Sequence, residues 1–207
     1  MKRILLSLIA VVALMGMTLP ASAQFRYGVV AGPTLTDLHF KQDLASVSQT
    51  VGGQAGVMGE MMFPGIGFGL DFGFLYNMAG AKVNLGDKEI WASQGYGNER
   101  LMLHQLQIPL HLRFKWTRMN GLEDTVAPFV YGGPDFSILL GHSKCKAMEY
   151  AGGDLGLTAG LGVELFKRWQ VSGSYTWGMT YLLKTRLLDN YSARGRQWTV
   201  RVVYFLK

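Results

Sequence analysis

Cysteine is almost absent from this chain of 207 residues: Cys145 is the only one, so no internal disulfide framework supports the fold. We interpret Cys145 as a free thiol in a loop rather than a redox or metal-binding group. Charged residues are also scarce, at 16% of the chain against about 25% in typical soluble proteins. After Ala23 no apolar stretch approaches the ~20 residues that a membrane-spanning helix needs. The sequence therefore fits neither a disulfide-rich secreted domain nor a helical membrane protein.

Glycine and aromatic residues, in contrast, are abundant. Glycine occurs 27 times, well above its usual share of about 7%. Aromatic residues make up 12% of the chain. An apolar, glycine-rich and charge-poor chain without membrane helices indicates a membrane β-barrel.

The N-terminus has the three parts of a secretory signal peptide. Lys2 and Arg3 form a basic region, an apolar region runs from Ile4 to about Met17, and Ala21-Ser22-Ala23 is an A-x-A cleavage site. We expect cleavage after Ala23, which leaves Gln24 at the mature N-terminus. Because this residue is not cysteine, a lipid-anchored lipoprotein is not expected. The predicted division is a signal peptide over residues 1–23 and an outer-membrane β-barrel domain over residues 24–207.

Period-two alternation of apolar and small or polar residues marks eight predicted strands. In the stretch FPGIGFGLDFGFLYN, every second residue from Ile66 to Tyr76 is large and apolar, and the residues between them are mostly glycine. No segment has convincing helical periodicity. The predicted strands are Phe25–Asp37, Gly53–Phe63, Phe63–Asn77, Met102–Trp116, Val126–Leu140, Asp154–Phe166, Trp169–Leu182 and Gln197–Lys207.

The connections between these strands alternate strictly between long and short. In chain order they are residues 38–52, 64–65, 79–101, 117–125, 141–153, 167–168 and 183–196. Tight periplasmic turns alternating with longer external loops are typical of outer-membrane barrels, and an even strand number leaves both termini in the periplasm. The sequence therefore predicts an all-β, eight-stranded antiparallel transmembrane barrel of the outer membrane.

A soluble barrel of the lipocalin type has the same periodicity with the opposite face in water. A water-exposed strand face should carry Lys, Glu, Thr and Arg, whereas the polar face here is mostly Gly, Ser, Thr and Gln. Small residues suit the interior of a narrow barrel, and the many large aromatic residues of the other face would not fit there. We therefore place the aromatic face against lipid, with aromatic girdles near the strand ends.

Seven strand charges share the small and polar face: Glu60, Asp71, Arg113, Lys115, Asp135, Glu164 and Arg201. A lipid-facing Arg or Lys near the membrane midplane costs about 2–4 kcal/mol, so seven charges on the lipid face would not be tolerated. We predict a charge network in the lumen, with Glu60, Asp71 and Arg113 at its centre. An eight-stranded barrel leaves room only for side chains, so this network should plug the lumen.

No constellation of residues predicts catalysis, a cofactor or a metal. The four histidines, His39, His104, His111 and His142, show no spacing typical of zinc ligands, and His111 is expected to face the lumen as a filler or hydrogen-bond partner. Nucleic-acid binding is not expected, because removing Lys2 and Arg3 lowers the formal charge from +6 to +4 and no strand face is basic and aromatic.

The last predicted external loop, LLKTRLLDNYSARGRQ, is basic. It carries Lys184, Arg186, Arg194 and Arg196 against Asp189. Exposed cations there can bind lipopolysaccharide phosphates through charge-assisted hydrogen bonds, and a merely solvated basic loop is the alternative.

Several short motifs together resemble the PorT-like outer-membrane β-barrel family of Bacteroidetes. They are FRYGVVAGPTLTDL, LQIPLHLRFKW, FVYGGPDFSILL, GLTAGLGVEL and WTVRVVYFLK, and they span nearly the whole mature chain. The resemblance implies an outer-membrane barrel that the barrel-assembly machinery inserts. The founding member of that family is associated with protein secretion across the outer membrane, and most members have no assigned activity.

These observations lead to a functional expectation with two alternatives. We expect a non-enzymatic outer-membrane protein with a structural or interaction role at the cell envelope, accessory to protein secretion or surface assembly through an envelope protein partner. A small-solute channel and a lipid-A-modifying enzyme are the alternatives.

Overall fold

The computed structural model describes residues 24–40, 46–65, 67–84, 98–117, 122–143, 148–181, 183–185 and 192–206. The predicted signal peptide, residues 1–23, and Cys145 lie outside these ranges. The long strands are β1 (Gln24–Phe40), β2 (Ser46–Met62), β3 (Phe68–Asn84), β4 (Asn98–Lys115), β5 (Val126–His142), β7 (Gly153–Leu165), β8 (Trp169–Gly178) and β10 (Ser192–Phe205). The short elements are β6 (Met148–Tyr150), β9 (Leu183–Thr185) and the 3-10 helix η1 (Leu122–Asp124).

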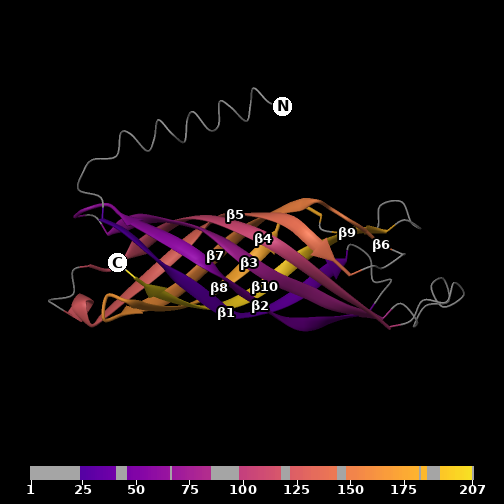
Figure 1. Cartoon of the computed structure of the whole chain (residues 1–207), viewed down its shortest axis with the longest axis horizontal. Coiled ribbons are helices and arrows are strands. Elements are labelled where there is room, and N and C mark those ends of the chain that lie inside the picture. Colours follow the sequence, from indigo (N-terminus) through magenta and orange to yellow (C-terminus); the bar gives the residue numbers. More distant parts are fainter. Residues whose placement is uncertain are drawn as a thin grey trace, which may run out of the picture.

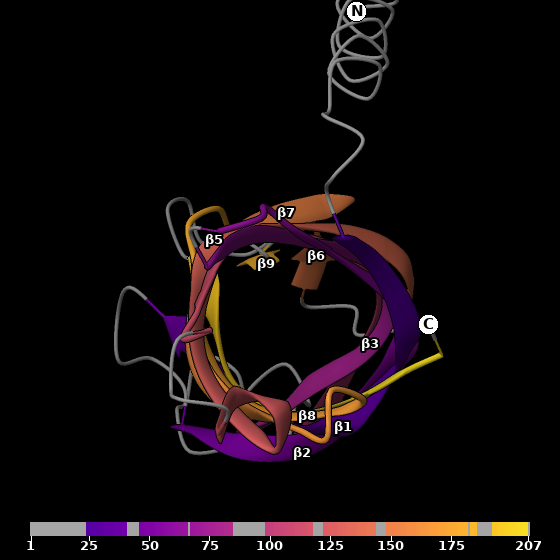
Figure 2. The ribbon, with the colours of Figure 1, turned by 90° about the vertical axis from the view of Figure 1, so that its left-hand side faces the viewer.

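The eight long strands form a closed antiparallel barrel. Each pairs with its neighbour in the order β1-β2-β3-β4-β5-β7-β8-β10, and β10 pairs back with β1 through partners such as Gly28 and Phe205. Figures 1 and 2 show the closed wall from the side and along its axis. The fold predicted from the sequence is therefore confirmed.

The two ends of the barrel differ in their connections. At one end, here called the turn end, residues 63–67, 116–125 and 166–168 join successive strands, and both Gln24 and Phe205 lie there (left in Figure 1). At the opposite end, the loop end, β6 and β9 add a small extension, in which β9 pairs with both β6 and β10. Among the described residues, no helix has the length and apolar character that a membrane crossing requires.

Several strands are longer at the loop end than predicted. β2 begins at Ser46 rather than at residue 53, and β3 continues to Asn84 rather than to residue 77. These added segments, SVSQTVG and MAGAKVN, carry polar and small residues that weaken the period-two signal. The strands therefore extend past the part of the sequence in which the alternation is clear.

The turn between β7 and β8 differs by one residue from the predicted Lys167-Arg168. Its central residues are Phe166 and Lys167, whose φ values of 52° and 59° lie in the left-handed region. The Arg168 N–H donates to the Leu165 carbonyl at 3.2 Å and closes the turn. Positive φ at both central residues is the geometry of a type I′ turn, whose twist suits a two-residue hairpin.

Alternation along each strand separates the two faces of the wall. On β8, Trp169 is 47% exposed and Trp177 46% exposed on the outer face, whereas Gln170 is 1% exposed and points inward. Outward rings meet between strands, as in the pair Trp169–Tyr204, whose ring centroids lie 4.7 Å apart. The outer face is thus apolar and aromatic. The inner face is mainly polar, and its buried apolar side chains include a cluster of Val30, Met58, Leu75, Val203 and Phe205.

Candidate functional site

The centre of the lumen at the turn end is an Arg113 side chain from β4. Its Nε and Nη2 atoms donate to Asp71 Oδ2 at 2.8 and 2.6 Å, and its Nη1 atom donates to Glu60 Oε2 at 2.7 Å. All three side chains are almost completely buried. Because Glu60 lies on β2 and Asp71 on β3, one guanidinium group joins three adjacent strands.

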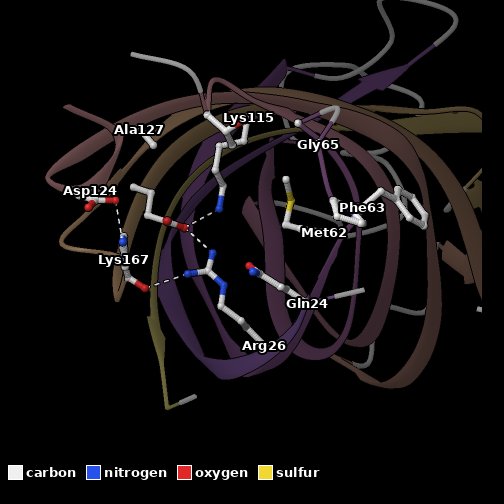
Figure 3. A pocket seen from close by; sticks show the side chains of 13 residues that line it. Gln24, Arg26, Met62, Phe63, Gly65, Lys115, Asp124, Ala127 and Lys167 are labelled. Carbon is white, nitrogen blue, oxygen red and sulfur yellow. Dashed lines mark hydrogen bonds and ion pairs between the residues drawn. The ribbon is translucent and has the colours of Figure 1, made fainter. Parts of the chain in front are cut away.

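A second set of contacts connects these strands with β1, β7 and β8. Lys115 Nζ lies 3.0 Å from Glu60 Oε1 and 2.8 Å from Glu164 Oε2, so it bridges β2 and β7. Arg26, on β1, donates to both of these carboxylates, at 2.5 Å in the case of Glu164 Oε2. Gln170 Nε2 also donates to both carboxylates at 2.7 Å. Figure 3 shows Arg26 and Lys115 pointing toward each other across this part of the barrel.

We call Arg26, Glu60, Asp71, Arg113, Lys115 and Glu164 the ion network. It contains three cations and three anions, so its formal charges cancel. Cancellation and hydrogen bonding are what buried charges need, because an unpaired buried charge costs far more than a paired one.

Aromatic rings from β5 and β10 lie in the same layer of the lumen as the ion network. Arg113 Cζ lies 4.1 Å from the centroid of the Phe129 ring on β5, and Arg26 Cζ lies 4.4 Å from the centroid of the Phe205 ring on β10. Both are cation–π distances. With Gln170 from β8, every strand of the barrel contributes a side chain to this layer. The layer therefore closes the lumen by direct contacts from all sides.

Glycines on β7 make room for the rings of β5. Gly162 pairs with Phe129 and Gly160 with Tyr131 in the β5–β7 register. A Cβ atom at Gly162 would lie 2.6 Å from Phe129 Cζ, and one at Gly160 would lie 2.5 Å from Tyr131 Cζ. The rings thus lie over the glycines of the neighbouring strand, which holds Phe129 beneath Arg113.

His111 and Asp135 form a second polar group, on the loop-end side of Arg113. His111 Nε2 lies 3.2 Å from Asp135 Oδ1, and the Thr158 hydroxyl donates to Asp135 Oδ2. The His111 ring also stacks on Tyr131, with 5.3 Å between the ring centroids. Asp135 is therefore paired within the lumen, but separately from the ion network.

Arg201 lies in the lumen at a different level from the ion network. Arg201 is 3% exposed and faces the lumen, but in the described part of the chain its Nε and Nη1 atoms have no hydrogen-bond partner. Its Cζ atom lies 5.9 Å from the Tyr131 ring centroid. In the β8–β10 register Arg201 pairs with Ser172, two residues nearer the loop end than Gln170. It therefore lies one step above the ion network.

Sequence reasoning placed the inward charges of β2, β3, β4 and β7 but missed Arg26 and Gln170. Arg26 alternates with the outward Phe25 and Tyr27, so the same parity rule identifies it as an inward cation. Gln170 was recognised only as part of the polar face of its strand. Neutral amides carry no charge signal, so nothing in the pattern marks one glutamine above the others.

At the turn end, Arg26, Lys115 and Glu164 of the ion network line a cavity. The cavity has a volume of about 350 Å³ and is bounded by Phe63 and Gly65 on one side and by Asp124 and Lys167 on the other (Figure 3). The Arg26 guanidinium donates to the Lys167 carbonyl at 2.8 Å, and Lys167 Nζ lies 2.6 Å from Asp124 Oδ1 at the exposed rim. No group of three or more His, Cys, Asp or Glu side chains suited to a metal ion occurs among the described residues.

The basic residues expected to contact lipopolysaccharide lie toward the loop end. Arg194 and Arg196 are exposed on β10, and Arg194 Cζ lies 5.1 Å from the Tyr181 ring centroid. Lys184 belongs to β9, and Arg186 lies outside the described residues. The structure thus places two of the four cations on one exposed strand.

A closed eight-stranded barrel with an apolar, aromatic outer face and a polar lumen, crossed by a charge-neutral ion network, is a transmembrane β-barrel of the outer-membrane type. A family model described as outer membrane protein beta-barrel domain matches residues 20–184, so the chain belongs to that family. The protein is accordingly located in the outer membrane.

Several solved structures of outer membrane proteins are similar to this chain. The outer membrane protein OprG from Pseudomonas aeruginosa is 13% identical over 88% of this chain and 94% of its own, with a TM-score of 0.52. Neisserial surface protein A has 10% identity over 86% and 96% of the two chains, with a TM-score of 0.46. The outer membrane enzyme PagL has 9% identity over 84% and 98%, with a TM-score of 0.42. No curated protein matches by sequence.

Proposed function

We propose that the protein is a non-enzymatic membrane anchor that holds its loop-end segments at the cell surface, with a structural or interaction role at the envelope. The observation that carries this proposal is the ion network. Its side chains come from five strands and meet in the lumen, and Phe129, Gln170 and Phe205 add contacts from the other three strands. When side chains fill the interior of a barrel by contacting one another, we expect its function at the two ends rather than in a pore.

A small-solute channel is the first alternative, and electrical conductance tests it. We expect the wild-type barrel to give no steady conductance steps in planar bilayers, because Arg113, Lys115 and Glu60 block the axial path with paired charges. The matched variant Asp71→Ala/Arg113→Ala removes one pair together with its volume and should give measurable leakage. Steady, ion-selective steps from the wild-type protein would establish a channel instead.

A lipid-A-modifying enzyme is the second alternative. Such an enzyme needs a nucleophile, a histidine and a carboxylate near the outer leaflet. His111 pairs with Asp135 inside the lumen, away from lipid, and the exposed His104–Tyr76 pair joins His104 Nδ1 to the Tyr76 hydroxyl at 2.6 Å. Neither of these two pairs, His111–Asp135 and His104–Tyr76, forms a hydrolytic triad, which favours the non-enzymatic proposal.

Contacts at the cell surface are the positive part of the proposal. The exposed Arg194 and Arg196 support binding to lipopolysaccharide phosphates, and the PorT-like motifs support an accessory role in protein secretion or surface assembly. After cross-linking in native outer membrane and purification, we expect both lipopolysaccharide and an envelope protein to accompany the barrel. Arg194→Ala/Arg196→Ala should reduce the bound lipopolysaccharide several-fold while the partner protein is retained. Purification of the barrel alone would reject the interaction role.

A further inference from the structure

A small cavity of about 40 Å³ lies in the lumen on the loop-end side of the ion network. Asn77, Gln107, Asp135 and Asp154 are among the residues that line it. The β-sheet register explains why they meet, since Gln107 pairs with Ser137 and Ser137 with Asp154, while Asn77 pairs with Gln105. The volume holds one or two water-sized groups, which excludes an organic ligand.

The polar atoms that face this cavity without a partner are oxygens. Within the described ranges, Asn77 Oδ1, Gln107 Oε1 and Thr36 Oγ1 are buried without a hydrogen-bond partner, and the Asn77 and Gln107 side chains are 2% and 4% exposed. The orientation of Asn77 is fixed, because its Nδ2 donates to Gln197 Oε1 at 3.0 Å and Gln197 Nε2 donates onward to Thr199. The Asn77 oxygen is therefore the part of this amide that stays available to a ligand in the cavity that Asn77 lines.

Asp154 adds an uncompensated carboxylate to these oxygens. No Lys or Arg in the described ranges forms an ion pair with it. Its hydrogen bonds come from neutral groups, the Ser137 side chain and Gln105 Nε2, which lies 3.5 Å from its Oδ1 atom. Asp135 is already paired with His111 and Thr158 and adds a second negative charge nearby. The basic lining residue, Arg196, is exposed on the outward side of β10, next to the buried Gln197.

We propose that this cavity binds one small, hard cation, held by the Asp154 carboxylate and the amide oxygens of Asn77 and Gln107. Carboxylate and amide oxygens are the ligands that Ca²⁺ and Mg²⁺ take in proteins. With only one unpaired carboxylate, the site belongs to the weak range of extracellular calcium modules, at dissociation constants of about 10⁻⁴–10⁻³ M. The proposal does not depend on the surface role of the protein.

Thermal unfolding of the refolded barrel in detergent, with Ca²⁺ or with K⁺ at matched ionic strength, tests the site. We expect millimolar Ca²⁺ to raise the unfolding temperature of the wild-type protein and to leave Asp154→Asn unchanged. Asp124→Asn is the matched control, because it removes an exposed carboxylate at the opposite end and should keep the full calcium effect. Equal shifts in the wild type and in Asp154→Asn, or no shift in the wild type, would overturn the proposal.

A measurement on the wild-type protein covers the case in which Asp154→Asn does not fold. Paramagnetic Mn²⁺ should broaden the side-chain amide resonances of Asn77 and Gln107 at sub-millimolar concentrations, and excess Ca²⁺ should restore them. Broadening confined to residues of the exposed rims would show only surface binding and would reject the site.

Discussion

Arg113→Ala is expected to lower the free energy of unfolding by about 3–5 kcal/mol, the cost of leaving buried charges without their partner. The substitution removes both hydrogen bonds to Asp71 and one to Glu60, and both carboxylates are 0% exposed. Urea unfolding of the barrel in lipid vesicles, followed by tryptophan fluorescence, measures the loss. The temperature at which the folded band disappears in a gel-shift assay should fall in parallel.

The partner substitution separates the ion pair from a general packing defect. In Arg113→Ala the buried Asp71 carboxylate loses its partner, and the second substitution removes that carboxylate. The free energy of unfolding of Asp71→Ala/Arg113→Ala should therefore fall clearly less than the sum of the losses in the two single variants. Lys167→Ala is the matched control: the pair of Lys167 with Asp124 is 61% and 64% exposed, so its loss should cost less than about 1 kcal/mol. Simple additivity of the two buried substitutions, or unchanged heat resistance of Arg113→Ala, would contradict a stabilising network.

The second large effect is expected on the outer face, where Leu161→Arg should destabilise the barrel by about 2–4 kcal/mol in a bilayer. Leu161 is 68% exposed and pairs with Gly173 on β8. Gly173 lies midway between Trp169 and Trp177, the outward aromatic residues near the two ends of that strand. Leu161 is therefore near the membrane midplane, where a lipid-facing arginine is most costly. Reversible unfolding in vesicles measures this difference.

A residue on the same strand, β7, but nearer the edge of the membrane provides the control. Leu157 pairs with Trp177, at the level of the outer aromatic residues, so Leu157→Arg should cost only about 0–1 kcal/mol. Equal costs at both positions would mean that Leu161 does not face the hydrocarbon core.

The architecture could be read from the sequence because two simple signals agree. Alternation along each strand assigns the outer face, and the strict alternation of long and short connections indicates a barrel with two different ends. The inward direction of Glu60, Asp71, Arg113 and Glu164 follows from the same parity. Parity, however, fixes only the face. It does not give the height of a residue in the barrel, which depends on how strands are offset when the sheet closes.

That missing height explains why the sequence did not show which lumenal charges meet in one layer. Arg201 shares the parity of the network, yet the β8–β10 register places it opposite Ser172, above the layer. Asp135 is likewise raised to the level of His111. The glycines show a related limit: small residues were expected because a bulky side chain would collide with the far wall. The structure shows instead that Gly160 and Gly162 accommodate rings from the adjacent strand.

The convergence of all eight strands on one layer has a consequence for how the protein folds. Arg26 contacts Glu164 across 138 residues of sequence and Glu60 across 34, so the layer is completed only when the first and last strands meet. Such contacts between distant parts of the chain favour slow folding. A closure shifted by one residue would also turn Arg26 toward lipid and leave Glu164 short of a cation. The layer thereby penalises misaligned closure, and it ties the completion of the barrel to a single alignment of β1 with β10.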